Sequence, residues 1–241
     1  AGVAVDLAAG TASGDASVGH DTFTGVNGVV GSNFNDTISG GSGNDFLNGG
    51  AGNDIINGGG GNDVLTGGAG SDTFVYVIGG GAGQVTDFSH GQGDRIDVTG
   101  VPGIFSLSEI QSHAQQVGVN TVIDFGGGNT ITLQNVTLSN LVAADFIFPN
   151  IVNGTTAADT LAGTSQADAI FGFDGNDRLQ GLAGNDQLNG GLGFDRAVYT
   201  DATGGIAVNL AAGTASGAGV GTDILVSIEG VVGSDFADTF N

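Results

Sequence analysis

The sequence is 241 residues long and carries 25 acidic residues against 3 basic ones, which gives a formal net charge of -22. A phosphate-binding surface needs clustered Lys and Arg side chains, so this charge balance excludes nucleic acid as a partner. Cysteine is absent, which excludes disulfides and thiolate metal sites, and no apolar run approaches the ~20 residues of a transmembrane segment.

The chain begins with residues 1–30, where AVDLAAG alternates apolar and small residues and predicts β-rich lead-in coils. Residues 31–76 then form an array of nine-residue units such as GGSGNDFLN and GGAGNDIIN, with aspartate at the sixth position and an apolar residue at the eighth. Glycine allows the positive φ angles of tight turns. Each unit therefore predicts a turn followed by a very short strand that turns one apolar side chain inward.

Residues 77–150 lack the nine-residue pattern and are expected to close the first array as a small mixed cap. Ser106 and Glu109 form a capping-box pattern, which predicts one short helix over EIQSHAQQ that ends near Gly118. The segments TVIDF and TITLQ, separated by GGGN, predict a hairpin. The segment LVAADFIF predicts a closing strand whose Phe side chains cover the apolar edge of the last coil.

A second array follows at residues 151–199, then a copy of the lead-in at 200–232 and the start of a third array at 233–241. The copy is close, because GVAVDLAAGTASG returns as GIAVNLAAGTASG with 11 of 13 residues identical, and GVVGSNFNDT returns as GVVGSDFADT. The sequence therefore has a long period of about 200 residues around a short period of nine. We expect the next repeat aspartate nine residues after Asp238.

The constant nine-residue spacing of the aspartates indicates metal binding. If each unit reverses the chain, two units make a coil of about 18 residues, and coils stack at the ~4.8 Å spacing of a parallel sheet. The aspartates then form columns, and a divalent cation between stacked turns would remove their repulsion. Ligation by carboxylate and carbonyl oxygens favours calcium over zinc or copper. Pairing each turn with the turn two units on predicts about six calcium ions or more.

The expected metal ligands are the aspartates of the two arrays, the first glycine of their turns and three aspartates that follow the first array. They are Asp36, Asp45, Asp54, Asp63, Asp72, Asp159, Asp168, Asp177, Asp186, Asp195, Gly40, Gly49, Gly58, Gly67, Gly172, Gly181, Gly190, Asp87, Asp94 and Asp97. For the last three, the alternative is that they only cap strand turns.

The pattern GGxGxDxUx, with U apolar, resembles the RTX, or haemolysin-type calcium-binding, repeats of bacterial secreted proteins. The resemblance covers residues 31–75 and 154–198. It implies an all-β fold of right-handed parallel β-roll (β-solenoid) arrays, with calcium between the turns. It also implies type I secretion and an extracellular or bacterial cell-surface location. The leading turns at Asp36, Asp159 and Asp168 lack the inner glycine and are expected to bind calcium less well.

No enzyme is predicted within this chain, because none of its 3 histidines belongs to an HExxH motif and no GxSxG motif occurs. The long period is similar to that of the stalk of an adhesin, a surface-layer protein or a filament. We therefore expect a structural module that calcium rigidifies, with neighbouring copies of the repeat as end-to-end partners. The alternative is the noncatalytic C-terminal RTX region of a secreted protease, lipase or alginate epimerase.

Overall fold

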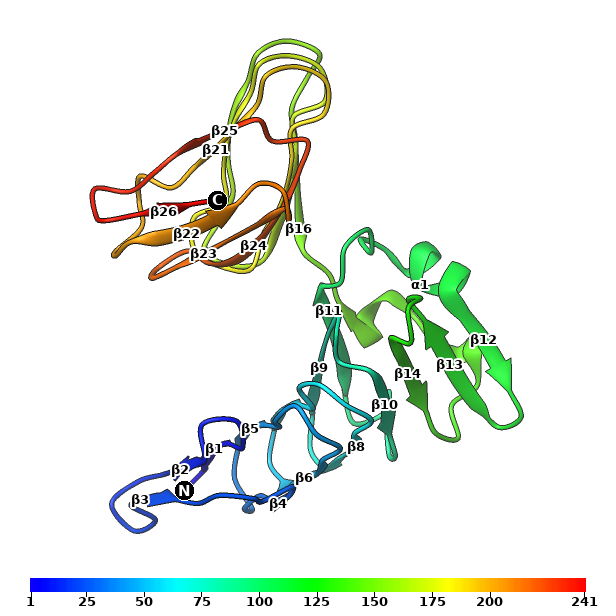
Figure 1. Ribbon diagram of the computed structural model, residues 1–241. Helices are drawn as coiled ribbons and strands as arrows, with labels where there is room; N and C mark the ends of the chain where they lie inside the picture. Colours follow the sequence, from blue (N-terminus) through cyan, green and yellow to red (C-terminus); the bar gives the residue numbers. More distant parts are fainter. The chain divides into compact units, whose positions relative to one another are not determined.

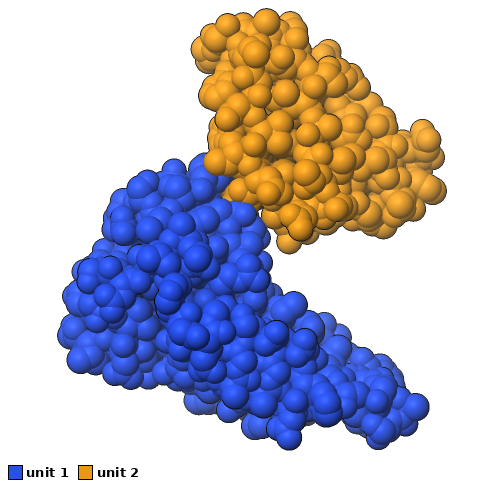
Figure 2. Space-filling view, turned by 180° about the vertical axis from the view of Figure 1, so that it is seen from behind, with its two compact units in different colours: residues 1–148 blue, residues 149–241 orange.

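The computed structural model describes residues 1–241. It contains two compact units, residues 1–148 and residues 149–241, which Figure 2 shows in different colours. Strands dominate both units (Figure 1), and the one α-helix is α1 (Leu107–His113). The protein is therefore all-β, as the sequence predicts. No helix is both long enough and apolar enough to cross a membrane.

The first array folds as a parallel β-roll, in which consecutive nonapeptide strands lie in two different sheets. Ile38 pairs with Ile56 and Ile56 with Phe74 in one sheet, while Leu47 pairs with Leu65 in the other. Partners are 18 residues apart, so two nonapeptides make one coil, which confirms the predicted architecture. The strands are β4 (Gly28–Val30), β5 (Thr37–Ser39), β6 (Phe46–Ala51), β7 (Ile55–Asn57), β8 (Val64–Ala69) and β9 (Thr73–Val77).

The core of this roll is one row of side chains per sheet. Ile38, Leu47, Ile56, Leu65 and Phe74, each at the eighth position of its unit, are buried. The side chains just before and just after each of these buried residues point away from the core, because successive side chains of a strand alternate between its two faces. One inward side chain per nine residues buries little apolar surface, so the roll needs cohesion from another source.

Ile55 and Ile56 offer a matched test of this core, since they are neighbours on β7 and are 46% and 0% exposed. We expect Ile56→Ala to lower the free energy of unfolding by about 2–5 kcal/mol, as in other buried aliphatic truncations. Ile55→Ala should change it by less than about 0.5 kcal/mol. Urea unfolding in saturating calcium measures both, and similar losses for the two variants would contradict the assigned strand faces.

The cap extends both sheets of the first roll. Its strands β10 (Ala82–Val85) and β11 (Arg95–Gly100) pair in parallel with β8 and β9. The predicted hairpin is confirmed, because β13 (Asn120–Asp124) pairs antiparallel with β14 (Thr130–Leu133). The closing strand is also present: Phe146 is buried and pairs with Ile96. The remaining cap elements are β12 (Ala114–Val117), η1 (Leu138–Asn140), η2 (Ala143–Asp145) and β15 (Phe146–Ile147).

The predicted end of the helix near Gly118 is wrong. Helix α1 ends at His113, because residues 114–117 form β12 and pair antiparallel with β13. Gly118, with φ of 62°, belongs to the turn between these two strands. The capping box is also incomplete, since the Glu109 carboxylate accepts from the Phe105 backbone N–H, at 2.6 Å, and from the Ser106 hydroxyl. Strand pairing thus takes residues that the local pattern assigned to the helix.

The second array repeats the same architecture. Ile170 pairs with Leu188 in one sheet, and Leu179 pairs with Ala197 in the other, again 18 residues apart. These four side chains are fully buried. The strands of this array are β16 (Asn150–Asn153), β17 (Thr160–Ala162), β18 (Asp168–Phe171), β19 (Arg178–Gln180), β20 (Gln187–Asn189) and β21 (Arg196–Val198).

Each copy of the long repeat forms three antiparallel strands, followed by a strand that pairs within the roll. In the first copy, β1 also pairs in parallel with β5, and β3 is the edge strand of its sheet. The first copy contains β1 (Ala4–Asp6), β2 (Thr11–Ser13) and β3 (His20–Thr22). The second contains β22 (Ile206–Asn209), β23 (Thr214–Gly217), β24 (Gly221–Val226), β25 (Gly230–Val232) and β26 (Thr239–Phe240).

Candidate metal sites

Each turn of the rolls places its aspartate carboxylate against the first glycine of the same turn. A Cβ atom added at Gly163 would lie 2.6 Å from Oδ2 of Asp168 and 2.7 Å from the carbonyl oxygen of Gly181, one coil further on. A side chain at this position would thus fill a space lined by oxygen atoms. The same closeness to the carboxylate of their own turn holds at Gly40, Gly49, Gly58, Gly67, Gly172, Gly181 and Gly190.

The aspartates are tied into columns by backbone hydrogen bonds. In each column the backbone N–H of one aspartate donates to Oδ1 of the aspartate 18 residues later, at 2.7–3.0 Å. The columns of the first array are Asp36, Asp54 and Asp72 at one edge, and Asp45 and Asp63 at the other. Those of the second array are Asp159, Asp177 and Asp195, and Asp168 and Asp186.

The second oxygen of many of these carboxylates is buried and has no hydrogen-bond partner. Burying a charged or polar oxygen without a partner is strongly unfavourable, so such an atom needs a cation or a proton. No group of three or more His, Cys, Asp or Glu side chains is placed to hold a metal ion by itself. The cradles instead combine carboxylates with backbone carbonyls, which suits a hard cation such as calcium. The unpartnered array oxygens are Oδ2 of Asp54, Asp72, Asp177, Asp186 and Asp195, and Oδ1 of Asp168.

Comparison with known proteins bears directly on these turns. A family model described as "RTX calcium-binding nonapeptide repeat (4 copies)" matches residues 21–56, 30–65, 39–74, 153–188 and 174–197. The chain carries RTX calcium-binding repeats. The matches cover all but the last residue of each predicted repeat stretch, 31–75 and 154–198, which confirms the resemblance seen in the sequence.

Among solved structures, the RTX chain is similar to the solution structure of the AlgE6R3 subunit from the Azotobacter vinelandii mannuronan C5-epimerase. The two are 27% identical with a TM-score of 0.41, and the match covers 50% of this chain and 76% of that one. No curated protein sequence matches the chain.

Burial changes the acidity of the RTX carboxylates. The pKa of Asp72 is raised to about 6, mainly by burial and to a smaller extent by the nearby carboxylates of Asp94 and Asp54. Burial likewise raises the pKa of Asp186 to about 7, with smaller contributions from Asp223 and Asp168. These groups resist carrying an uncompensated charge at neutral pH, and a bound cation would compensate that charge.

The leading RTX turns differ from those behind them. Both oxygens of Asp36 already accept backbone bonds, from Val3 at 2.6 Å and from Ser32 at 2.5 Å. Oδ2 of Asp159 accepts from the backbone and hydroxyl of Thr155. Oδ2 of Asp168 likewise accepts from Thr164, but its Oδ1 is buried without a partner. Donors of the protein thus occupy carboxylate oxygens in the leading turns, and weaker calcium binding there stays a prediction.

The three aspartates after the first array lie in two settings. Asp94 continues a column, because the backbone N–H of Asp72 donates to its Oδ1 at 3.0 Å. Asp87 accepts from the backbone N–H groups of Gly67 and Gly68, at 3.0 and 2.8 Å. Both carboxylates are close enough to raise the pKa of Asp72. Asp97 instead accepts from the backbone and hydroxyl of Thr99, which is a local turn.

Two acidic residues that the sequence reasoning missed continue the columns of the second array. The backbone N–H of Asp186 donates to Oδ1 of Asp223 at 3.0 Å, and that of Asp195 donates to Oε2 of Glu229 at 2.8 Å. They follow their column partners by 37 and 34 residues instead of 18. Residues 218–226, AGVGTDILV, match the pattern GGxGxDxUx at Gly219, Gly221, Asp223 and Leu225, so the nine-residue pattern could have revealed Asp223. Glu229 has no such pattern around it, and the signal available for it was the copy of the long repeat that carries it.

Proposed function

We propose that this chain is a calcium-binding structural module of a secreted or cell-surface bacterial repeat protein. In this role it folds and stiffens on extracellular calcium as part of a stalk, surface layer or filament. The observation that carries the proposal is the set of four carboxylate columns, two in each array, whose unpartnered buried oxygens face cradles that only glycine leaves open. RTX repeat proteins are typically secreted, and their repeats bind calcium.

The proposed calcium ions lie between turns of adjacent coils. Asp36, Asp54 and Asp72 would hold two of them and Asp45 with Asp63 a third. In the second array Asp159, Asp177 and Asp195 would likewise hold two, and Asp168 with Asp186 one. Six ions would contribute +12 and bring the formal charge from -22 to -10. Calcium would thereby remove most of the repulsion within the columns and supply the cohesion that the thin cores lack.

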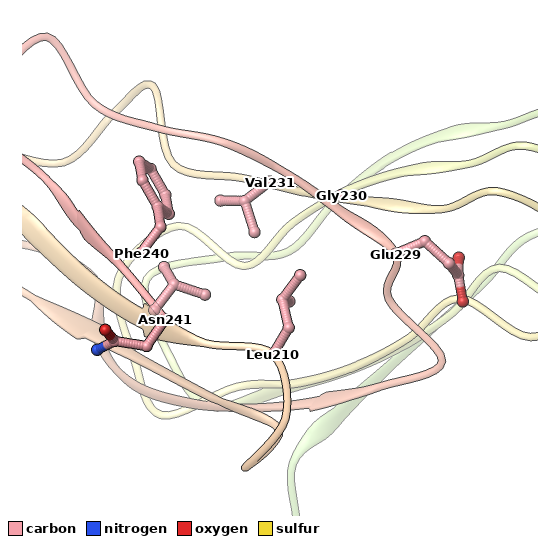
Figure 3. Close-up of a pocket in the computed structure, with 7 residues that line it drawn as sticks. Leu210, Glu229, Gly230, Val231, Phe240 and Asn241 are labelled. Carbon is pink, nitrogen blue, oxygen red and sulfur yellow. The ribbon is translucent and has the colours of Figure 1, made fainter.

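A pocket in the second unit supports end-to-end repetition. This cavity of about 310 Å³ is lined in part by Val231 and Phe240 (Figure 3). The equivalent residues of the first copy are Val29 and Ile38, which pack with Leu47 of β6 in the core of the first roll. We propose that the pocket receives the apolar side chain of a strand equivalent to β6 from a neighbouring repeat.

Single-molecule force extension of the chain tests the mechanical role. In calcium we expect two separate unfolding events, one for each array, because the ions cross-link adjacent coils. In chelator we expect extension without force peaks, as for a flexible polymer. Unfolding forces no higher in calcium than in chelator would contradict a load-bearing stalk. That outcome would favour the alternative, the noncatalytic RTX region of a secreted enzyme.

A further inference from the structure

Two of the 3 basic residues of the chain lie side by side on the second roll. Arg178 on β19 pairs with Arg196 on β21, one coil further on. Their neighbours Leu179 and Ala197 are fully buried, so the two arginine side chains lie on the outer face of the sheet. Like charges on adjacent strands repel each other, so this pairing does not stabilise the roll.

Neither guanidinium group is neutralised by a carboxylate of the chain. The one ion pair of the structure joins His90 and Asp145, so no acidic side chain forms a salt bridge with either arginine. The guanidinium of Arg196 instead lies over the ring of Phe194, 4.7 Å from its centroid, and this contact holds it in place. Two adjacent guanidinium groups suit carboxylates, because each presents a fork of N–H donors that matches the two oxygens.

Exposed apolar side chains border the two arginines. Phe194, Phe173 and Leu192 are 46%, 49% and 73% exposed. Leu192 and Phe173 are neighbours, because the backbone N–H of Leu192 donates to the carbonyl oxygen of Phe173 at 2.7 Å. We call Arg178, Arg196, Phe173, Leu192 and Phe194 the arginine patch. Its apolar part favours a protein partner over a polysaccharide, since exposed Leu and Phe gain most from contact with another apolar surface.

Phe173 has a backbone conformation that the roll itself does not need a phenylalanine to adopt. Its φ is 71°, and the residue at the same position of the next coil is Gly191, with φ of 95°. Positive φ is disfavoured for a bulky residue with a Cβ atom. The ring stacks on Phe171 at a centroid distance of 6.3 Å but stays half exposed. A strained residue that adds little to the core points to contact with another molecule.

We propose that the arginine patch binds an acidic surface of a second copy of this chain. Each copy has a formal charge of -22, so its surface is complementary to a cluster of positive charge. The first lead-in, for example, exposes Asp15 and Asp21 near Val18, which is 39% exposed. Because two different surfaces meet, the contact continues from copy to copy and does not close on a pair. This inference rests on the proposed function and names the lateral partner of the proposed layer or filament.

Calcium is expected to strengthen this contact. Each arginine of the patch directly follows an aspartate of the column that contains Asp159, Asp177 and Asp195. The three carboxylates and the two guanidinium groups carry a formal charge of -1, and the two proposed calcium ions change it to +3. The exposed carboxylate of Asp174 lowers both values by one. The patch therefore attracts an acidic partner only when the column is loaded.

The double variant Arg178→Gln/Arg196→Gln tests the proposal, and Arg95→Gln is its matched control. Arg95 is also exposed on a roll strand, but its partner on the neighbouring strand is Thr73. Sedimentation velocity in saturating calcium, over a series of chain concentrations, should show that the parent self-associates. The double variant should associate about tenfold or more weakly, and Arg95→Gln as strongly as the parent. High salt should weaken association of the parent, because it screens exposed charges.

A second variant separates contact with a partner from a role in folding. Phe173→Gly removes the exposed ring and suits the positive φ, so it should weaken self-association without lowering the urea midpoint of the second roll. A lower midpoint with unchanged association would mean that the ring serves the roll and would contradict the patch. The calcium stoichiometry of all variants should match the parent, since the substituted side chains lie outside the cradles.

The outcomes distinguish this inference from the proposed function. A parent that binds calcium but stays monomeric, or a double variant that associates as strongly as the parent, would overturn the inference alone. Titration of the parent with polygalacturonate tests the other class of partner. Binding that needs both arginines, without self-association, would assign the patch to an acidic polysaccharide and overturn the second copy as partner. Failure of the parent to bind calcium would instead overturn the proposed function.

Discussion

Removal of calcium is expected to unfold both RTX arrays. Each roll has a core of one apolar side chain per nonapeptide and columns of buried carboxylates with unpartnered oxygens. Extracellular calcium modules bind at ~0.1–1 mM, and a site held at 100 times its dissociation constant adds about 2.7 kcal/mol. Several such sites together exceed the usual net stability of a domain, about 5–15 kcal/mol. The folded state should therefore depend on the ions.

Circular dichroism during a chelator titration measures this effect. We expect loss of the β spectrum as free calcium falls, and its recovery when calcium is added back. Magnesium should restore it poorly, because magnesium requires near-ideal octahedral geometry at shorter distances and gives up its water reluctantly. A β spectrum that is unchanged in calcium-free buffer would show that the rolls are stable without metal and that calcium does not drive folding.

The nine-residue phase was enough to predict the rolls. Aspartate at the sixth position and an apolar residue at the eighth determine which side chains stack, and the pairing of Ile38 with Ile56 and Phe74 follows from that phase. The order of the aspartates in each column follows from it too. These features are local and repeated, so each unit confirms the register of the next.

The features that the sequence reasoning missed depend on contacts between distant segments. The helix was expected to continue to Gly118, but pairing of residues 114–117 with β13 ends it at His113. Asp223 reaches Asp186 across 37 residues, because an antiparallel hairpin stands between the two turns and breaks the 18-residue spacing, although AGVGTDILV around Asp223 keeps the repeat pattern. A sequence period predicts contacts between units that repeat. The contact between an array and the neighbouring copy of the long repeat occurs only once per long repeat, so no period predicts it.

Replacement of Asp54 is expected to reduce the number of calcium ions bound by the first array more than replacement of Asp36. Asp54 lies in the middle of its column: its Oδ1 accepts from the Asp36 N–H, its own N–H donates to Asp72, and its Oδ2 is buried without a partner. Asp54→Ala should therefore disrupt the cradles on both sides. Asp36 has a neighbour on one side only, and its oxygens are partly occupied by Val3 and Ser32.

Isothermal titration with calcium decides between the two variants. Asp54→Ala should lose two bound ions and about 5 kcal/mol of calcium-dependent stability at 100 times the dissociation constant, against at most one ion and about 2.7 kcal/mol for Asp36→Ala. Asp54→Asn separates ligand loss from hydrogen-bond loss, because its amide oxygen still accepts the Asp36 N–H. Equal losses for Asp54→Ala and Asp36→Ala would refute the arrangement in which one aspartate serves two ions, since only a shared ligand makes the middle of a column different from its end.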